Sequence, residues 1–70
     1  MLQFPLQGKE YIELNNLLKV TGMCDSGGAA KMVISAGEVR VDGAVETRKR
    51  CKIRPGQVVE FQGDMVEVHR

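Results

Sequence analysis

Residues 26–43 read SGGAAKMVISAGEVRVDG, and the spacing of their apolar side chains changes halfway along. The first half carries apolar residues at helical intervals, and the Ser26 hydroxyl is placed to cap the free amides of a helix. Gly37 suits the left-handed residue that ends such a helix. Beyond it, apolar and polar residues alternate as in a strand, and Asp42-Gly43 predicts a type I′ hairpin. We therefore expect a helix followed directly by a β-hairpin.

Another helix is expected before this segment, over residues 11–21. Its apolar stripe at helical spacing consists of Leu14, Leu17, Leu18 and Thr21. Gly22 is suited to the turn that ends it. Residues 1–10 are expected to form an N-terminal arm or an edge strand, because Pro5 lacks the amide that an inner strand must donate.

Short strands and tight turns account for the remainder of the chain. Strands are expected over residues 44–46, 58–61 and 65–68, with turns at Pro55-Gly56 and Gly63-Asp64. Helices followed by strands indicate an α+β fold, in which two helices pack on a small antiparallel sheet of short strands. The methionines expected to fill gaps in the core are Met23, Met32 and Met65.

The length of 70 residues has room for one domain, residues 1–70, without a deep cleft between lobes. We therefore expect no enzyme, no cofactor and no small-molecule substrate. No set of four metal ligands is present either, since the sequence offers Cys24, Cys51 and His69 only. Both cysteines are expected to be free thiols, although the basic neighbours of Cys51 leave a redox role open. Without a signal-peptide pattern or a long apolar run, we expect a cytoplasmic monomer.

The net charge of +1 results from cancellation along the chain. Residues 31–54 carry a net charge of +4, whereas residues 1–30 carry −1 and residues 55–70 carry −2. Five of the ten basic residues lie between Arg48 and Arg54. Such a cluster is typical either of a solvated loop or of a surface that binds a polyanion.

The order and spacing of these elements resemble the S4 RNA-binding domain, over about residues 12–61. The residues that carry the resemblance are Ser26-x-x-x-Ala30-Lys31-x-x-Ile34-x-x-Gly37-x-Val39-x-Val41-Asp42-Gly43, Leu14-x-x-Leu17-Leu18 and Ile53-x-Pro55-Gly56-x-Val58-Val59. The family occurs in a ribosomal protein, in pseudouridine synthases and in a tyrosyl-tRNA synthetase. The resemblance implies an S4-like (αL motif) fold and non-catalytic binding of structured RNA of the rRNA or tRNA type, in ribosome assembly or translation.

Two positions depart from the family's pattern. The first helix of the family usually opens with Arg-Leu-Asp, and the aligned residues here are Glu13, Leu14 and Asn15. An acid thus replaces a basic residue that often touches RNA. Gly27 stands where a basic residue often follows the capping serine. We therefore expect the basic cluster of residues 48–54 to compensate for weaker contacts from the helices.

The resemblance and the charge pattern together predict an RNA-binding face made of helix, hairpin and loop. Its expected residues are Lys31, Arg40, Arg48, Lys49, Arg50 and Lys52. Arginine and lysine side chains pair with phosphates, and a face with few aromatic rings suits folded RNA recognised by its shape. Arg54 is expected to lie at the solubilising rim, and Tyr11 in the core at the start of the first helix.

Two other functions stay open at this point. One is a protein-interaction adaptor, in which the acidic residues 55–70 or the basic loop would dock on a partner. The other is a helix-turn-helix DNA-binding domain, whose second helix should present polar and basic residues to the major groove. This fits less well, because residues 27–31 supply only Lys31 for that purpose.

Overall fold

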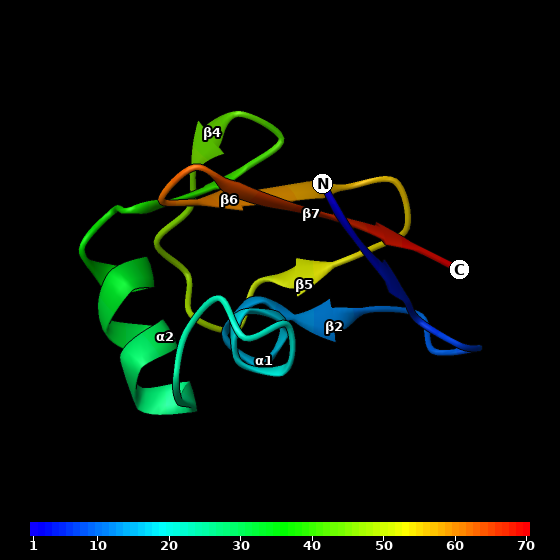
Figure 1. Cartoon of the computed structure of the whole chain (residues 1–70), viewed down its shortest axis with the longest axis horizontal. Coiled ribbons are helices and arrows are strands. Elements are labelled where there is room, and N and C mark those ends of the chain that lie inside the picture. Colours follow the sequence, from blue (N-terminus) through cyan, green and yellow to red (C-terminus); the bar gives the residue numbers. More distant parts are fainter.

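The computed structural model describes residues 1–70 and contains two helices, a five-stranded sheet and a separate two-stranded ribbon. The elements in chain order are β1 (Leu2–Pro5), β2 (Ile12–Glu13), α1 (Leu14–Val20), α2 (Gly27–Ser35), β3 (Val39–Val41), β4 (Ala44–Val45), β5 (Lys52–Ile53), β6 (Val58–Phe61) and β7 (Asp64–His69). Figure 1 shows both helices and the β2/β5 ribbon on the same side of the large sheet. The predicted α+β class is confirmed.

The large sheet has the strand order β1-β7-β6-β3-β4 and is mixed. Its inner strands pair antiparallel, but β1 pairs parallel with β7, with Leu2 opposite Val66 and Pro5 opposite His69. The prediction of a wholly antiparallel sheet is therefore wrong at this edge. Tight hairpins force antiparallel pairing, whereas the long connection between β1 and β7 leaves the direction free. The prediction of an edge strand containing Pro5 is confirmed.

Helix α1 is shorter than predicted, because Ile12 and Glu13 form strand β2. Ile12 lies opposite Ile53 of β5, which is fully buried, and Ile12 packs against the same core. The apolar stripe is confirmed for Leu14, Leu17 and Leu18, which are all fully buried. A β-branched residue directly before a leucine stripe can join either a helix or a strand, and here the partner strand β5 decides the outcome.

Helix α2 begins and ends as its sequence predicts. The Ser26 hydroxyl accepts a hydrogen bond from the amide of Ala29 at 3.1 Å. At the other end, Gly37 adopts φ +79° and donates to the carbonyl of Ile34. The amide of Glu38 then donates to the carbonyl of Val33. This pair of bonds satisfies carbonyls that the helix leaves free.

The hairpins follow their turn residues. Asp42 and Gly43 have φ of 51° and 84°, which are the two positive values of the predicted type I′ turn. The β6–β7 turn is centred on Gln62 and Gly63, one residue earlier than predicted, so that Asp64 already belongs to β7.

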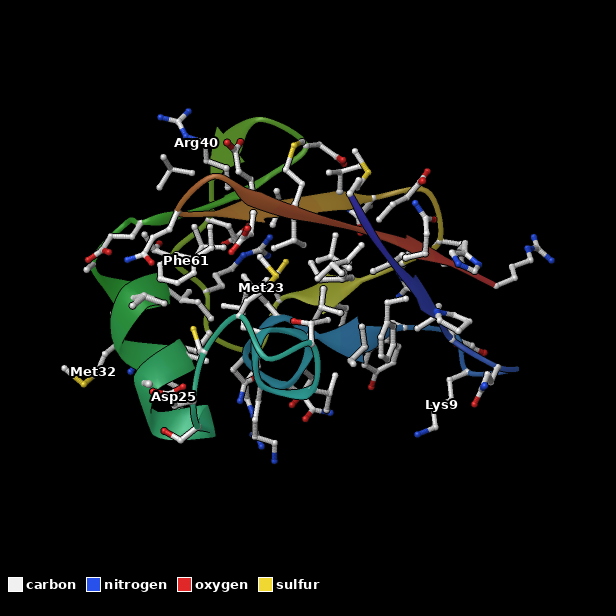
Figure 2. The ribbon with its side chains drawn as sticks, in the orientation of Figure 1. Lys9, Met23, Asp25, Met32, Arg40 and Phe61 are labelled. Atoms are coloured by element: carbon white, nitrogen blue, oxygen red, sulfur yellow. The ribbon has the colours of Figure 1, made fainter.

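The core lies between the inner face of the large sheet and the helices, where Figure 2 shows Phe61 and Met23. The prediction that all three methionines fill this core is wrong for two of them. Met32 is 74% exposed on the outer side of α2, and Met65 is exposed because it alternates with the buried Val66. Neither helix has the length and apolar character needed to cross a membrane.

Replacing Gly37 by alanine is predicted to lower the free energy of unfolding by about 1 kcal/mol, because the left-handed backbone is costly for a residue with a side chain. The added methyl group would meet Val45 at an ordinary contact distance of 3.7 Å, so backbone strain alone is tested. Urea unfolding measures the change.

Gly27→Ala is the matched control, since Gly27 lies in the first turn of α2 with nothing within 4 Å of the new methyl group. It should leave stability unchanged or raise it slightly. Equal losses in the two variants would contradict the proposed cause.

Candidate nucleic-acid interface

The basic loop, defined as residues 46–51, is docked on the first turn of α1. The amide of Leu14 donates to the carbonyl of Cys51 at 2.8 Å, and the amide of Asn15 donates to the carbonyl of Lys49 at 3.0 Å. The first amides of a helix have no partner within the helix, so the loop backbone caps α1. Strand β5 then continues from the loop and pairs with β2. The loop is thus fixed in position while its basic side chains stay exposed.

Arg48 is held by Glu46 within the loop. Its Nε donates to Glu46 Oε2 and its Nη2 to Glu46 Oε1, both at 3.0 Å, and its backbone amide donates to Oε2 at 2.9 Å. These hydrogen bonds to Arg48 lower the pKa of Glu46 to about 2, and the carboxylate raises the pKa of Arg48 above its usual value. At neutral pH the pair is therefore fully ionised, and Glu46 offsets much of the charge on Arg48.

Arg50 is paired with a carboxylate from the other side of the interface. Its Nε lies 3.5 Å from Oε1 of Glu13, the β2 residue directly before α1. The arginine side chain remains 76% exposed, so the contact is open to solvent. Exposed pairs of this kind contribute little stability but do reduce the local positive charge.

Lys31 and Lys49 come together across α2 and the basic loop. Both side chains line one shallow hollow, together with Met32, Ser35 and Ala36 of the outer side of α2 and its end. Neither lysine has a carboxylate within 4.0 Å, since the two ion pairs of the molecule involve Arg48 and Arg50. The two lysines are therefore the free cations where the helix meets the loop.

Arg40 lies apart from the other expected residues. It alternates with the buried Val39 on β3, and Figure 2 shows it on the side of the large sheet away from the helices. Its strand partner there is Glu60, and its guanidinium donates to the carbonyl of Gly43 at 3.3 Å. The expectation that one face contains all six basic residues therefore does not agree with this geometry.

Lys52 lies on the β2/β5 ribbon beside Tyr11 and near Arg54, neither of which is among the six expected RNA-binding residues. Its Nζ is 5.0 Å from the centroid of the Tyr11 ring, and Cζ of Arg54 is 5.6 Å from the same centroid. Tyr11 is half-buried directly before β2, so the prediction that it lies in the core at the start of the first helix is wrong. The sequence does not predict this cluster, because β2 and β5 have two residues each and are too short to show the alternation of apolar and polar residues that marks a strand.

The cysteines are free, and both thiols have pKa values above the usual range. Burial is the main cause in each case, with Asp25 adding to it at Cys24 and Glu46 at Cys51. The basic neighbours of Cys51 thus fail to activate it, and the thiol stays protonated at neutral pH. No group of three His, Cys, Asp or Glu side chains converges on a point that could hold a metal ion.

The pKa of Glu46 leads to a testable pH dependence. Because the folded pKa of about 2 lies below the ordinary glutamate pKa of 4.5, the ion pair stabilises the fold above pH 4.5, and this contribution is lost as the pH falls toward 2. Carbon-13 NMR titration of the Glu46 carboxyl should show the low pKa. In Glu46→Gln, this part of the acid-induced loss of stability should disappear; an unchanged pH profile would contradict the assignment.

The chain resembles known proteins along nearly its whole length. A family model described as S4 domain matches residues 4–69. YbcJ of Escherichia coli (strain K12) is 53% identical over 68 residues, which is 97% of each chain. The probable ribosome maturation protein RlbA of Bacillus subtilis (strain 168) is 39% identical over 54 residues, covering 77% of this chain and 76% of RlbA.

The solution structure of Escherichia coli YbcJ superimposes with a TM-score of 0.77 at 51% sequence identity, and the match covers all of this chain and 89% of YbcJ. That structure was described as revealing an ALFAL motif involved in RNA-binding. The two helices, the mixed sheet of short strands and the matched residues lead to one conclusion: the chain belongs to the S4 domain family.

Proposed function

We propose that this protein binds structured RNA of the rRNA or tRNA type without catalysing a reaction. The observation that carries the proposal is the position of the basic loop, which caps the first turn of α1 and lies beside Lys31 of α2. The chain that contains this surface belongs to the S4 domain family. A cationic surface that is already rigid before binding loses little conformational entropy when RNA docks. The proposed contacts are made by Lys31, Lys49, Arg48, Arg50 and Lys52.

The chemistry of this face favours the phosphate backbone over the bases. Its charged groups are exposed arginine and lysine side chains, which pair with phosphates and 2′-hydroxyls of folded RNA. Aromatic residues make up 4% of the sequence, too few for a series of stacked bases. Recognition by shape, with little sequence preference, is therefore the proposed mode.

The biological setting is proposed from the relatives. The structure of YbcJ was described as containing a motif involved in RNA-binding, and RlbA is described as a probable ribosome maturation protein. Ribosome assembly or translation is therefore the proposed process. We propose that residues 1–70 act as one RNA-binding domain and as a monomer in the cytoplasm, where free thiols stay reduced.

The DNA-binding alternative would require a different part of the molecule to contact the nucleic acid. For DNA, α2 would have to enter the major groove with Lys31 as its one basic residue. Binding of duplex DNA as tight as that of an RNA stem-loop would favour this alternative.

The variant Lys31→Ala/Lys49→Ala is predicted to bind RNA less tightly than the parent and with a weaker salt dependence. Each lost phosphate contact should reduce the slope of log affinity against log salt by roughly 0.7 to 0.9. Fluorescence anisotropy with a labelled RNA stem-loop, repeated over a salt series, measures both quantities.

Arg40→Ala serves as the control, because it removes an exposed basic residue from the far side of the sheet. It should bind RNA like the parent, and circular dichroism should show all variants folded. If the double variant kept the parent's affinity and slope, RNA binding through this face would be refuted.

A further inference from the structure

The outer face of the β2/β5 ribbon continues the basic loop. In the antiparallel register Glu13 lies opposite Lys52, and Ile12 lies opposite Ile53. Because side chains alternate along a strand, the two isoleucines face the core while Glu13 and Lys52 face outward. Extending the register by one residue places Tyr11 opposite Arg54 on that same outward face. The distance of 5.6 Å between Arg54 Cζ and the centroid of the Tyr11 ring agrees with this placement.

Tyr11 collects two cations on this face. Lys52 Nζ and Arg54 Cζ lie 5.0 and 5.6 Å from the ring centroid, both within the range of cation–π attraction. Two like charges beside the same ring repel each other, and the attraction of each to the ring offsets part of that repulsion. The ring therefore gives both flexible side chains a preferred position.

The cations at Tyr11 differ from the two arginines of the loop, because neither forms an ion pair with a carboxylate. Glu46 pairs with Arg48 and Glu13 with Arg50, but no carboxylate lies within 4.0 Å of Lys52 or Arg54. A hollow next to Arg54 is lined by Lys9 and Arg70 as well, with Glu10 as the one acidic residue. Figure 2 shows Lys9 at this end of the molecule, on the ribbon's side of the sheet.

We propose that Tyr11 positions Lys52 and Arg54 as a phosphate-binding pair, which extends the RNA interface from the basic loop along the ribbon. This inference rests on the proposed RNA binding and deepens it. Arg54 becomes a contact residue, and Tyr11 becomes a positioning residue that acts through the two cations. The ligand is the phosphate backbone of RNA, because neighbouring phosphates along a strand can bind two cations that form no ion pair within the protein.

The test compares four variants with the parent on one fluorescein-labelled RNA stem-loop over a salt series. Lys52→Ala/Arg54→Ala should weaken binding and reduce the salt slope by roughly 0.7 to 0.9 for each lost contact. Tyr11→Leu keeps both charges, so its slope should stay close to the parent's while its affinity falls about two- to fivefold. Tyr11→Phe keeps the ring and should bind like the parent, and so should the control Arg40→Ala.

A readout without RNA isolates the positioning role. The Tyr11 ring should shift the Lys52 side-chain protons upfield in the NMR spectrum, and Tyr11→Leu should abolish this shift while Tyr11→Phe retains it. Thermal unfolding followed by circular dichroism identifies any variant that fails to fold. Lys52→Ala/Arg54→Ala still tests the phosphate contacts if Tyr11→Leu is unstable, because both of its side chains are exposed.

The outcomes separate this inference from the function on which it rests. If Lys52→Ala/Arg54→Ala binds like the parent while Lys31→Ala/Lys49→Ala loses affinity, the proposal that Lys52 and Arg54 bind phosphates is wrong. The proposed RNA binding through the basic loop is then still supported. If Tyr11→Leu, correctly folded, binds as tightly as the parent, Tyr11 has no positioning role. If the parent itself does not bind the RNA stem-loop, both proposals are overturned.

Discussion

The capping of α1 by the basic loop is the contact on which the arrangement of this surface depends. Leu14 and Asn15 begin the helix, and their amides would lack partners without the carbonyls of Cys51 and Lys49. Leaving buried amides unpaired is costly, so the loop cannot move away freely. The same contact brings β5 alongside β2 and places Ile53 in the core. Helix, loop and ribbon are thereby joined into one rigid unit.

Charge on this unit is distributed more finely than a count of basic residues indicates. The carboxylates of Glu46 and Glu13 offset Arg48 and Arg50, whereas the lysines at positions 31, 49 and 52 have no such partner. Glu13, directly before α1, thus has a role within the surface as the partner of Arg50. A polyanion would therefore meet the free Lys49 between the two paired arginines, with Lys31 beside it on α2 and Lys52 after the loop.

Local signals in the sequence predict the helix α2 and the hairpin after it almost residue by residue. Ser26, Gly37 and Asp42-Gly43 act through bonds and backbone angles that involve only near neighbours, so no distant segment can override them. The errors lie where a distant segment takes part. Ile12 joins β2 because β5 offers a partner, and β1 runs parallel to β7 because no short turn links them. Met32 and Met65 are exposed because α2 and β7 turn these side chains away from the core, and that orientation depends on how the elements pack.

The candidate site likewise has features that the sequence predicts and features that depend on contacts between distant segments. The sequence by itself determined that the basic residues cluster between positions 48 and 54 and that they follow a hairpin, since both are properties of the chain order. Only the tertiary structure decided that Lys31 lies beside Lys49, that Arg40 lies on the opposite face, and that Tyr11 contacts Lys52 and Arg54. The physical reason is that charge and turn chemistry are local, whereas contacts between residues far apart in the chain arise only when a shared core and the capping of α1 bring their elements together.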